Sequence, residues 1–115
     1  MITIELTQLN RELWNAGQQL KGDAKYLKEL AQDKAETERK YKKALARKIM
    51  LLKDQKMPAT LINDLSRGDE EVADLRFYRD LARVQYDTAK SSMRSAEAQI
   101  SSIQSILRYQ SDIAK

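Results

Sequence analysis

The chain has 115 residues, of which 33% are charged, and a net charge of +4 at pH 7. It contains no Cys and no His, which excludes disulfides, thiolate nucleophiles, Cys/His zinc sites and imidazole-dependent triads. Three Gly and one Pro are too few for the many turns of a β-sandwich, a barrel or a parallel sheet. The composition favours an all-α protein that is not an enzyme, with no cofactor, metal or small-molecule substrate.

Neither a membrane span nor a signal peptide is predicted. A transmembrane helix needs about 18 or more consecutive apolar residues, and the sequence has no such run. The first residues, Met-Ile-Thr-Ile-Glu, lack the basic start and apolar stretch of a signal peptide. We therefore expect a soluble, cytoplasmic protein without membrane contact.

The first predicted helix covers residues from about 3 to 55. Its apolar residues follow alternating spacings of three and four, which is the pattern of one buried helix face. This register contains Leu6, Leu9, Leu13, Ala16, Leu20, Leu27, Leu30, Tyr41, Ala44 and Leu51. Polar residues interrupt it at Asp23, Lys34, Thr37 and Lys48. A neighbouring register fits the second half better, so we expect the apolar stripe to drift around the helix. That register contains Leu20, Ala24, Leu27, Ala31, Ala35, Leu45, Ile49 and Leu52.

Residues 56–68 are predicted to form a bend that carries a short helix. The only Pro lies at its start and Gly68 at its end, and Gly favours helix termination. Leu61, Ile62 and Leu65 have helical spacing, and Thr60 is the candidate N-cap. We expect this short helix to lie over the tip of the molecule.

An apolar target for the short helix is predicted on the segment that follows. Phe77, Leu81 and Val84 lie at positions i, i+4 and i+7 and therefore on one helix face. They are off the main apolar stripe of that segment, so we expect the short helix to pack against them.

The second long helix is predicted over residues from about 69 to 113. Asp69 is a suitable N-cap, and Glu70 and Glu71 place negative charge at the positive end of the helix dipole. Its heptad positions are Val72, Leu75, Arg79, Ala82, Tyr86, Ala89, Met93, Ala96, Ile100, Ile103 and Leu107. All but Arg79 are apolar, and small and large side chains alternate, which favours close antiparallel packing. Replacing Ala89 by Leu should therefore cost about 1 to 3 kcal/mol of stability through overpacking.

These elements predict one domain over residues 1–115, a long antiparallel helical hairpin that resembles a coiled coil and has a short helix at its tip. Each long helix of such a hairpin buries one face and leaves its flanks in water, which gives a thin core for a chain of this length. Association of two hairpins would bury more apolar surface. We therefore expect a homodimer.

Positive charge is concentrated in residues 34–56, which carry nine basic and three acidic side chains. In an antiparallel hairpin this segment lies beside the start of the second helix. The predicted nucleic-acid-binding residues are Lys40, Lys43, Arg47, Arg76 and Arg83. The alternative is a solvated helix face with partly paired charges. Tyrosines in this region could stack on bases, but Tyr41 and Tyr86 lie on the apolar registers and are expected in the core.

The opposite end of the hairpin is poor in charge, because Asn, Gln and Ser dominate both helices there. Depletion of charge is typical of protein contact surfaces. Trp14 and Tyr109 are the large side chains at this end and the predicted anchors for a partner. Leu61, Ile62 and Leu65 of the short helix are the other predicted partner-binding residues. The alternative for this end is a neutral solvated surface.

Residues 57–76 (MPATLINDLSRGDEEVADLR), followed by Arg79-Asp80 and the heptads of residues 86–103, resemble small helical proteins encoded by phages and prophages of Gram-positive bacteria. The resemblance extends over roughly residues 40 to 108. It implies a bacterial host cytoplasm and two possible roles. The first is an accessory protein in phage DNA replication or recombination that uses its basic surface. The second is a coiled-coil adaptor or inhibitor that binds a host or phage protein.

Overall fold

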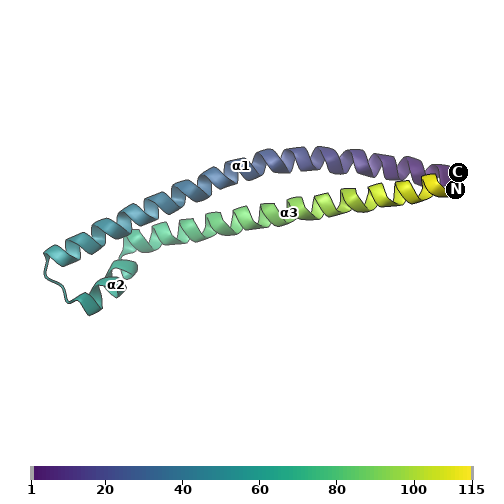
Figure 1. Ribbon diagram of the computed structural model, residues 1–115. Helices are drawn as coiled ribbons and strands as arrows, with labels where there is room; N and C mark the ends of the chain where they lie inside the picture. The colour runs from purple at the N-terminus through teal and green to yellow at the C-terminus, as the bar shows by residue number, and fades with distance from the viewer. Residues whose placement is uncertain (1, 115) are drawn as a thin grey trace. The chain divides into compact units, whose positions relative to one another are not determined.

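The computed structural model describes the backbone of residues 2–114 and the side chains of residues 6–113. Its helices are α1 (Ile2–Asp54), α2 (Ala59–Gly68) and α3 (Glu70–Ala114), and no strand occurs in the described backbone. The long helices α1 and α3 form an antiparallel hairpin, and the short helix α2 lies in the connection between them (Figure 1). The predicted fold class is confirmed.

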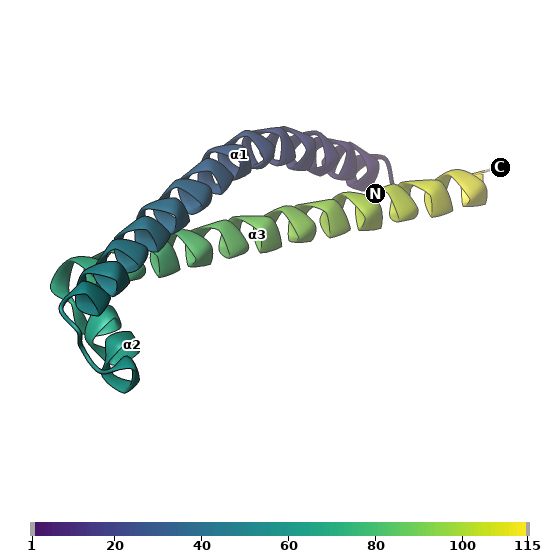
Figure 2. The same cartoon turned by 60° about the vertical axis from the view of Figure 1, so that its left-hand side comes forward.

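Two compact units share this hairpin. Unit 1 comprises Met1–Lys28 and Asp87–Lys115, and unit 2 comprises Glu29–Tyr86. Unit 2 therefore contains all of α2, the second half of α1 and the first part of α3, which can be followed by colour in Figure 2. Each unit has its own α1–α3 contacts.

The apolar face of α3 matches the sequence pattern. All eleven predicted heptad positions, from Val72 to Leu107, are buried or half-buried. The exception in the pattern, Arg79, is accommodated because its guanidinium carbon lies 4.3 Å from the centre of the Tyr41 ring. A cation over an aromatic face is a favourable contact, so a charged side chain can occupy this position.

The apolar face of α1 keeps its first register for longer than expected. All four polar interruptions are half-buried, so the same face continues as far as Lys48. Ala24 and Ala35 are exposed, and the prediction that the neighbouring register takes over there is wrong. The drift occurs only in the last turns, where Leu52 is buried and Leu51 is exposed. Three of the four polar residues have partners: Lys34 lies over the Tyr86 ring, Thr37 donates to the carbonyl of Asp33, and Lys48 pairs with Asp69.

The core of unit 2 is built around Tyr41, Ala44 and Val72, against which Leu45 and Leu75 pack. Val72 is 2% exposed and Tyr41 is 7% exposed. This cluster joins the second half of α1 to the first turns of α3. It holds the two helices at the positions from which the basic side chains extend.

The end of α1 is closed by a pair of backbone hydrogen bonds around Lys56. The amide of Met57 donates to the carbonyl of Leu52 at 3.0 Å, and that of Lys56 donates to the carbonyl of Lys53 at 3.0 Å. This is the Schellman pattern, in which the residue after the C-cap adopts a left-handed conformation. Lys56 has a φ of 59°, where Gly is the usual residue. The sequence gives no warning of this turn, because no Gly is present there.

The predicted ends of the short helix are wrong in detail. α2 starts directly after Pro58, which occupies the N-cap position without a side-chain hydrogen bond, so Thr60 lies inside the helix. The fixed φ of Pro58, −56°, already suits a helix start, and its carbonyl accepts from the amide of Leu61 at 2.9 Å. Gly68 is the last helical residue and has no positive φ. The helix ends because Asp69 is extended.

Asp69 is the N-cap of α3, as predicted. Its Oδ2 accepts a hydrogen bond from the amide of Val72 at 3.3 Å, and its carbonyl accepts from the amide of Ala73 at 2.8 Å. Lys48 Nζ lies 3.3 Å from the other carboxylate oxygen. The hydrogen bond from Val72, with Lys48 as a further contribution, lowers the pKa of Asp69 below its ordinary value. The cap therefore ties the end of α1 to the start of α3.

The packing of α2 differs from the expectation. Ile62 and Ser66, which are four residues apart, form its buried side, and Ile62 is only 7% exposed. Leu61 and Leu65 are exposed, because they lie about 100° around the helix from that side. Phe77, Leu81 and Val84 are exposed as well, so α2 does not cover them. The predicted contact between these two apolar faces is wrong.

Candidate nucleic-acid interface

The five predicted basic residues do not form one surface. Lys40, Lys43 and Arg47 line a groove on one flank of unit 2, together with Glu71 and other residues. Arg83 lies on the other flank, where it pairs with Glu38. Arg76 precedes Arg83 by seven residues and therefore lies on the same side of α3 as Arg83. Of the five predicted residues, Lys40, Lys43 and Arg47 therefore lie together, and Arg76 and Arg83 lie apart from them.

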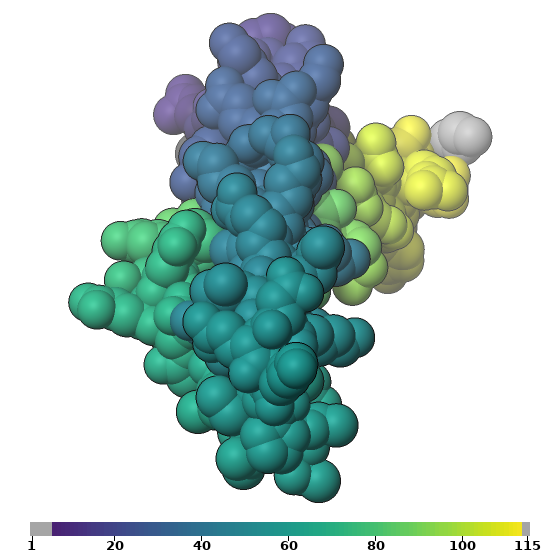
Figure 3. Space-filling view, turned by 90° about the vertical axis from the view of Figure 1, so that its left-hand side faces the viewer, coloured from purple at the N-terminus to yellow at the C-terminus, as the bar shows by residue number. Residues whose placement is uncertain are grey.

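The groove has two adjoining parts. The first, of about 310 Å³, is lined by Arg39, Lys40, Lys43, Arg47, Glu71 and Leu75. The second, of about 350 Å³, is lined by Asp33, Thr37, Lys40, Leu75, Tyr78, Leu81, Ala82 and Gln85. Lys40 and Leu75 line both parts, so we treat them as one continuous feature and call it the basic groove. Figure 3 views the molecule from the end at which α1 passes into α2.

Three cations in the basic groove have no ion-pair partner. Among the described residues, no carboxylate lies within 4.0 Å of the charged groups of Lys40, Lys43 or Arg47. Arg39 is different, because it pairs with Glu36 at 2.6 Å. That hydrogen bond lowers the pKa of Glu36, and the more distant charges of Lys40 and Lys43 contribute in the same direction. The groove therefore presents three cations to solvent.

On the opposite flank, Arg83 and Lys42 share one carboxylate, that of Glu38. Arg83 donates to Glu38 at 2.8 Å across 45 residues of sequence, and Lys42 lies 3.8 Å from the same carboxylate. The hydrogen bond from Arg83 lowers the pKa of Glu38 below its ordinary value, with the charge of Lys42 as the next contribution. Arg83 thus links the two helices rather than presenting a free charge.

The tyrosines divide between core and surface. Tyr41 is buried under Arg79, and the ring of Tyr86 lies 4.5 Å from Lys34 Nζ, so both are packed as predicted and cannot stack on a base. Tyr78 is 55% exposed and lines the apolar part of the basic groove. Phe77 contacts it edge to face, with ring centres 5.6 Å apart. Tyr78 is the aromatic side chain in position to meet a ligand in the groove.

The predicted partner-binding residues also separate. Trp14 and Tyr109 are each 67% exposed, so both are accessible. Trp14 follows Glu12 by two residues, which turns it about 200° from the side of α1 on which Glu12 lines a groove. Tyr109 is about 90° from the side of α3 that lines the same groove, so the two rings do not share a surface. Of the three predicted residues in α2, Ile62 is buried and unavailable to a partner.

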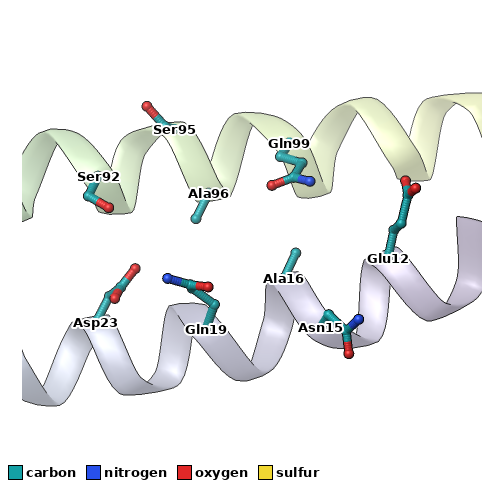
Figure 4. A pocket seen from close by; sticks show the side chains of 9 residues that line it. All are labelled: Glu12, Asn15, Ala16, Gln19, Asp23, Ser92, Ser95, Ala96 and Gln99. Atoms are coloured by element: carbon teal, nitrogen blue, oxygen red, sulfur yellow. The ribbon is translucent and has the colours of Figure 1, made fainter.

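A second groove, in unit 1, is polar. It measures about 520 Å³, and Figure 4 shows the methyl groups of Ala16 and Ala96 pointing from the two helices into the space between them. Its other lining residues are Glu12, Asn15, Gln19, Asp23, Ser92, Ser95 and Gln99. One oxygen of Asp23, Oδ2, is buried without a hydrogen-bond partner. In the part of the chain with described side chains, no three acidic residues cluster as metal ligands would.

Comparison of the chain with protein-family models, curated proteins and solved structures finds no match. No helix in the described part of the chain has the length and apolar character needed to cross a bilayer.

Proposed function

We propose that this protein is a non-enzymatic nucleic-acid-binding accessory protein whose basic groove binds phosphate groups. The observation that carries this proposal is the set of three cations, Lys40, Lys43 and Arg47, that have no ion-pair partner and line one groove. On the opposite flank of unit 2, Arg83 is engaged by Glu38. Unpaired Lys and Arg side chains on one surface are the electrostatic footprint of phosphate binding.

The spacing of these cations suits a phosphate backbone. Lys40 and Arg47 are seven residues apart on α1, a rise of about 10 Å. Successive phosphates of one strand in duplex DNA are separated by about 3.4 Å along the axis, so this rise covers about three phosphates. One carboxylate, that of Glu71, lines the basic part of the groove at its α3 side. A few contacts of this kind predict moderate affinity with little preference for base sequence.

The resemblance of residues 57–76 to phage and prophage proteins supports a role in DNA replication or recombination in a bacterial host. Both processes use proteins that contact phosphates without reading sequence. The proposal makes the protein an accessory in such a process, with nucleic acid as its ligand.

Salt dependence tests the proposal. Binding of fluorescently labelled single-stranded and double-stranded DNA is measured by anisotropy between about 50 and 200 mM salt. Three phosphate contacts should give a slope of log K against log salt of roughly −2 to −3. Absence of binding by the parent protein at about 50 mM salt would refute the proposal.

A charge-matched pair of variants locates the binding surface. Lys43→Glu with Arg47→Glu removes two groove cations and should abolish the measured binding. Arg76→Glu with Lys90→Glu makes the same change in net charge at exposed positions outside the groove, and should retain most of the affinity. Equal weakening by both pairs would mean diffuse attraction to the whole molecule and would contradict binding in the groove.

A second candidate function is supported by a different observation. Leu61 and Leu65 form an exposed apolar pair on α2, which fits an adaptor or inhibitor that binds a host or phage protein. Affinity capture from bacterial lysate, with and without nuclease, distinguishes the two functions. Partners lost after nuclease treatment favour nucleic-acid binding. One protein that is retained after nuclease, and lost with Leu61→Asp, favours the adaptor.

A further inference from the structure

Unit 1 has little apolar interior of its own. Its buried apolar residues among the described side chains are Ala16, Ala96 and Ile103, of which two have only a methyl group. The same unit leaves larger apolar side chains in water: Trp14, Tyr26, Ile106, Tyr109 and Ile113. Burying apolar surface is the main source of folding free energy. Among the described side chains of unit 1, Ile103 is the large apolar residue that is fully buried, whereas the large apolar residues on the packed faces of α1 and α3, such as Leu13, Met93 and Ile100, are half-buried.

Three of these exposed residues lie on one side of α3. Ile106, Tyr109 and Ile113 are spaced by three and four residues, so they form one stripe. Toward the N-terminus the same side continues through Ser91, Ser95, Ala98, Ser102 and Ser105. We call these eight residues the neutral face of α3. All eight are exposed.

Charged side chains are rare on the neutral face. Between residues 88 and 111 the charged residues of α3 are Lys90, Arg94, Glu97 and Arg108. With Val72 as position a of the heptad, all four fall at positions b and e. The neutral face occupies positions c, f and g, on the opposite flank and the outer side of the helix, and Asp112, at position f, is a charged residue at its C-terminal end. From residue 91 to residue 111, a rise of about 30 Å, the face carries no charge, which is suited to contact with protein rather than water.

The neutral face is complementary to itself when two copies run antiparallel. With a two-fold axis beside Ser102, Tyr109 of one copy faces Ser95 of the other, and Ile106 faces Ala98. Ile113 faces Ser91 in the same arrangement. Each large side chain then meets a small one, so the two helices can approach closely. The contact is isologous, as in most soluble homodimers, and it closes without leaving a free copy of the same surface.

The exposed area of the chain is consistent with such a contact. The chain exposes 8770 Å², whereas a compact monomer of 13.3 kDa exposes roughly 6,450 Å². The excess, roughly 2,300 Å², is larger than the approximately 800 Å² that each partner buries in a standard interface. The chain therefore exposes enough surface, beyond that of a compact monomer, for one interface of standard size.

We propose that two copies of this protein dimerise through the neutral face of α3 in unit 1, antiparallel and with the two-fold axis beside Ser102. The interface consists of large apolar side chains near the end of α3 packed against small side chains nearer its middle. It is separate from the basic groove, which belongs to unit 2, and does not depend on the proposed function.

Sedimentation equilibrium of the full chain tests the dimer. The parent protein should sediment at twice its monomer mass, and Ile106→Glu with Tyr109→Glu should sediment at the monomer mass because two charges would be buried. Ser101→Glu with Gln104→Glu adds the same charges at exposed positions outside the neutral face, and should remain dimeric. A monomeric parent, or a dimer that survives charges on the neutral face, would overturn the proposal.

Disulfide trapping tests the direction of the helices without disturbing the apolar contacts. The chain has no Cys, so single Cys variants form only intermolecular disulfides. Ser102→Cys should be crosslinked on oxidation because the two copies meet at the axis. The two Ser95 residues would be about 21 Å apart, far beyond the reach of a disulfide, so Ser95→Cys should remain uncrosslinked. Crosslinking of Ser95→Cys, or none of Ser102→Cys, would overturn the arrangement.

Discussion

Unit 2 and unit 1 contain polar residues on the same apolar face of the long helices, but only unit 2 provides them with partners. Lys34 lies over Tyr86, and Lys48 pairs with Asp69. Thr37 donates to the carbonyl of Asp33, in its own helix, at 2.9 Å. In unit 1, by contrast, buried oxygens of Asp23 and Gln110 have no hydrogen-bond partner.

The comparison shows when a polar residue is tolerated in a helix interface. A paired charge or a satisfied hydroxyl adds packing without leaving an unmet hydrogen bond, whereas an unpartnered buried oxygen loses its contact with water. Ser66 Oγ, in α2, is one such unpartnered atom within unit 2. We therefore expect unit 2 to contribute most of the free energy of unfolding. Replacing unpartnered polar residues in unit 1 should raise that free energy.

The largest expected effect is loss of the unit 2 core. Tyr41→Ala removes a buried ring and the surface on which Arg79 lies, so the free energy of unfolding should fall by about 3 to 5 kcal/mol. Urea denaturation followed by circular dichroism measures the change. Tyr26→Ala, at an exposed position in unit 1, is the control and should change stability by less than about 0.5 kcal/mol. Similar losses for both variants would contradict the difference between the units.

Asp23→Leu should stabilise unit 1. It replaces a carboxylate that has a buried, unpartnered oxygen with an apolar side chain on the apolar face of α1, and should raise the free energy of unfolding by about 1 to 3 kcal/mol. Lys25→Leu, at an exposed position, should stay within about 0.5 kcal/mol of the parent. The same urea titrations measure both variants. A destabilised Asp23→Leu variant would show that the carboxylate has a favourable role in unit 1.

Two glycines in α1 give a smaller gain. Gly17 and Gly22 lie inside the helix, and an added Cβ would meet no atom within 4 Å at either position. Each Gly→Ala substitution should therefore raise the free energy of unfolding by about 0.5 to 1 kcal/mol through helix propensity alone. Thermal unfolding of the single and double variants tests whether the two gains add. A loss of stability would reveal a close contact at these positions.

The smallest expected effect is a dependence on pH that originates in unit 2. The pKa values of Glu38 and Asp69 are lowered on folding, by the hydrogen bonds from Arg83 and Val72 respectively. The unfolded chain therefore binds more protons near pH 4, and this stabilisation is present above the unfolded pKa values of about 4. It is lost as pH falls through the lowered values. Melting temperatures between pH 3 and 7 should decline at the acid end.

Glu38→Gln with Asp69→Asn is the variant that isolates this dependence. It keeps side chains of the same shape but cannot titrate, so its melting temperature should vary less between pH 3 and 5 than that of the parent. Asp69→Asn retains a good N-cap residue. A variant that loses stability toward acid as steeply as the parent would place the dependence on other carboxyl groups.

Much of the fold could be predicted from the sequence because helix periodicity is local information. The heptads of α3 and the cap at Asp69 follow from residues within a few turns of one another. The flank on which each cation lies could not be predicted, because that depends on how α1 and α3 are rotated against each other. Arg83 pairs with Glu38, 45 residues away in the chain, and therefore lies on the other flank from Lys40, Lys43 and Arg47. The sequence alone does not reveal such a distant pairing.

The orientation of α2 could not be predicted from the sequence either. Its apolar residues Leu61, Ile62 and Leu65 lie close together around the helix, so the side with Leu61 and Leu65 and the side with Ile62 could each face inward. The buried side includes Ser66, which hydropathy would assign to the surface. The turn at Lys56 could not be predicted either, because a Lys in the left-handed backbone conformation has no sequence signature.

The antiparallel connection through α2 also sets an order for folding. The residues that meet as Tyr41 and Arg79 are 38 positions apart in the chain, whereas Ala16 and Ala96, across the polar groove, are 80 apart. The entropy lost on closing a loop grows with its length, so the contacts nearest α2 form at the lowest cost. Once these contacts have formed, the next turn of α1 already lies close to the turn of α3 with which it pairs. We therefore expect pairing to propagate from the core around Val72 into unit 1.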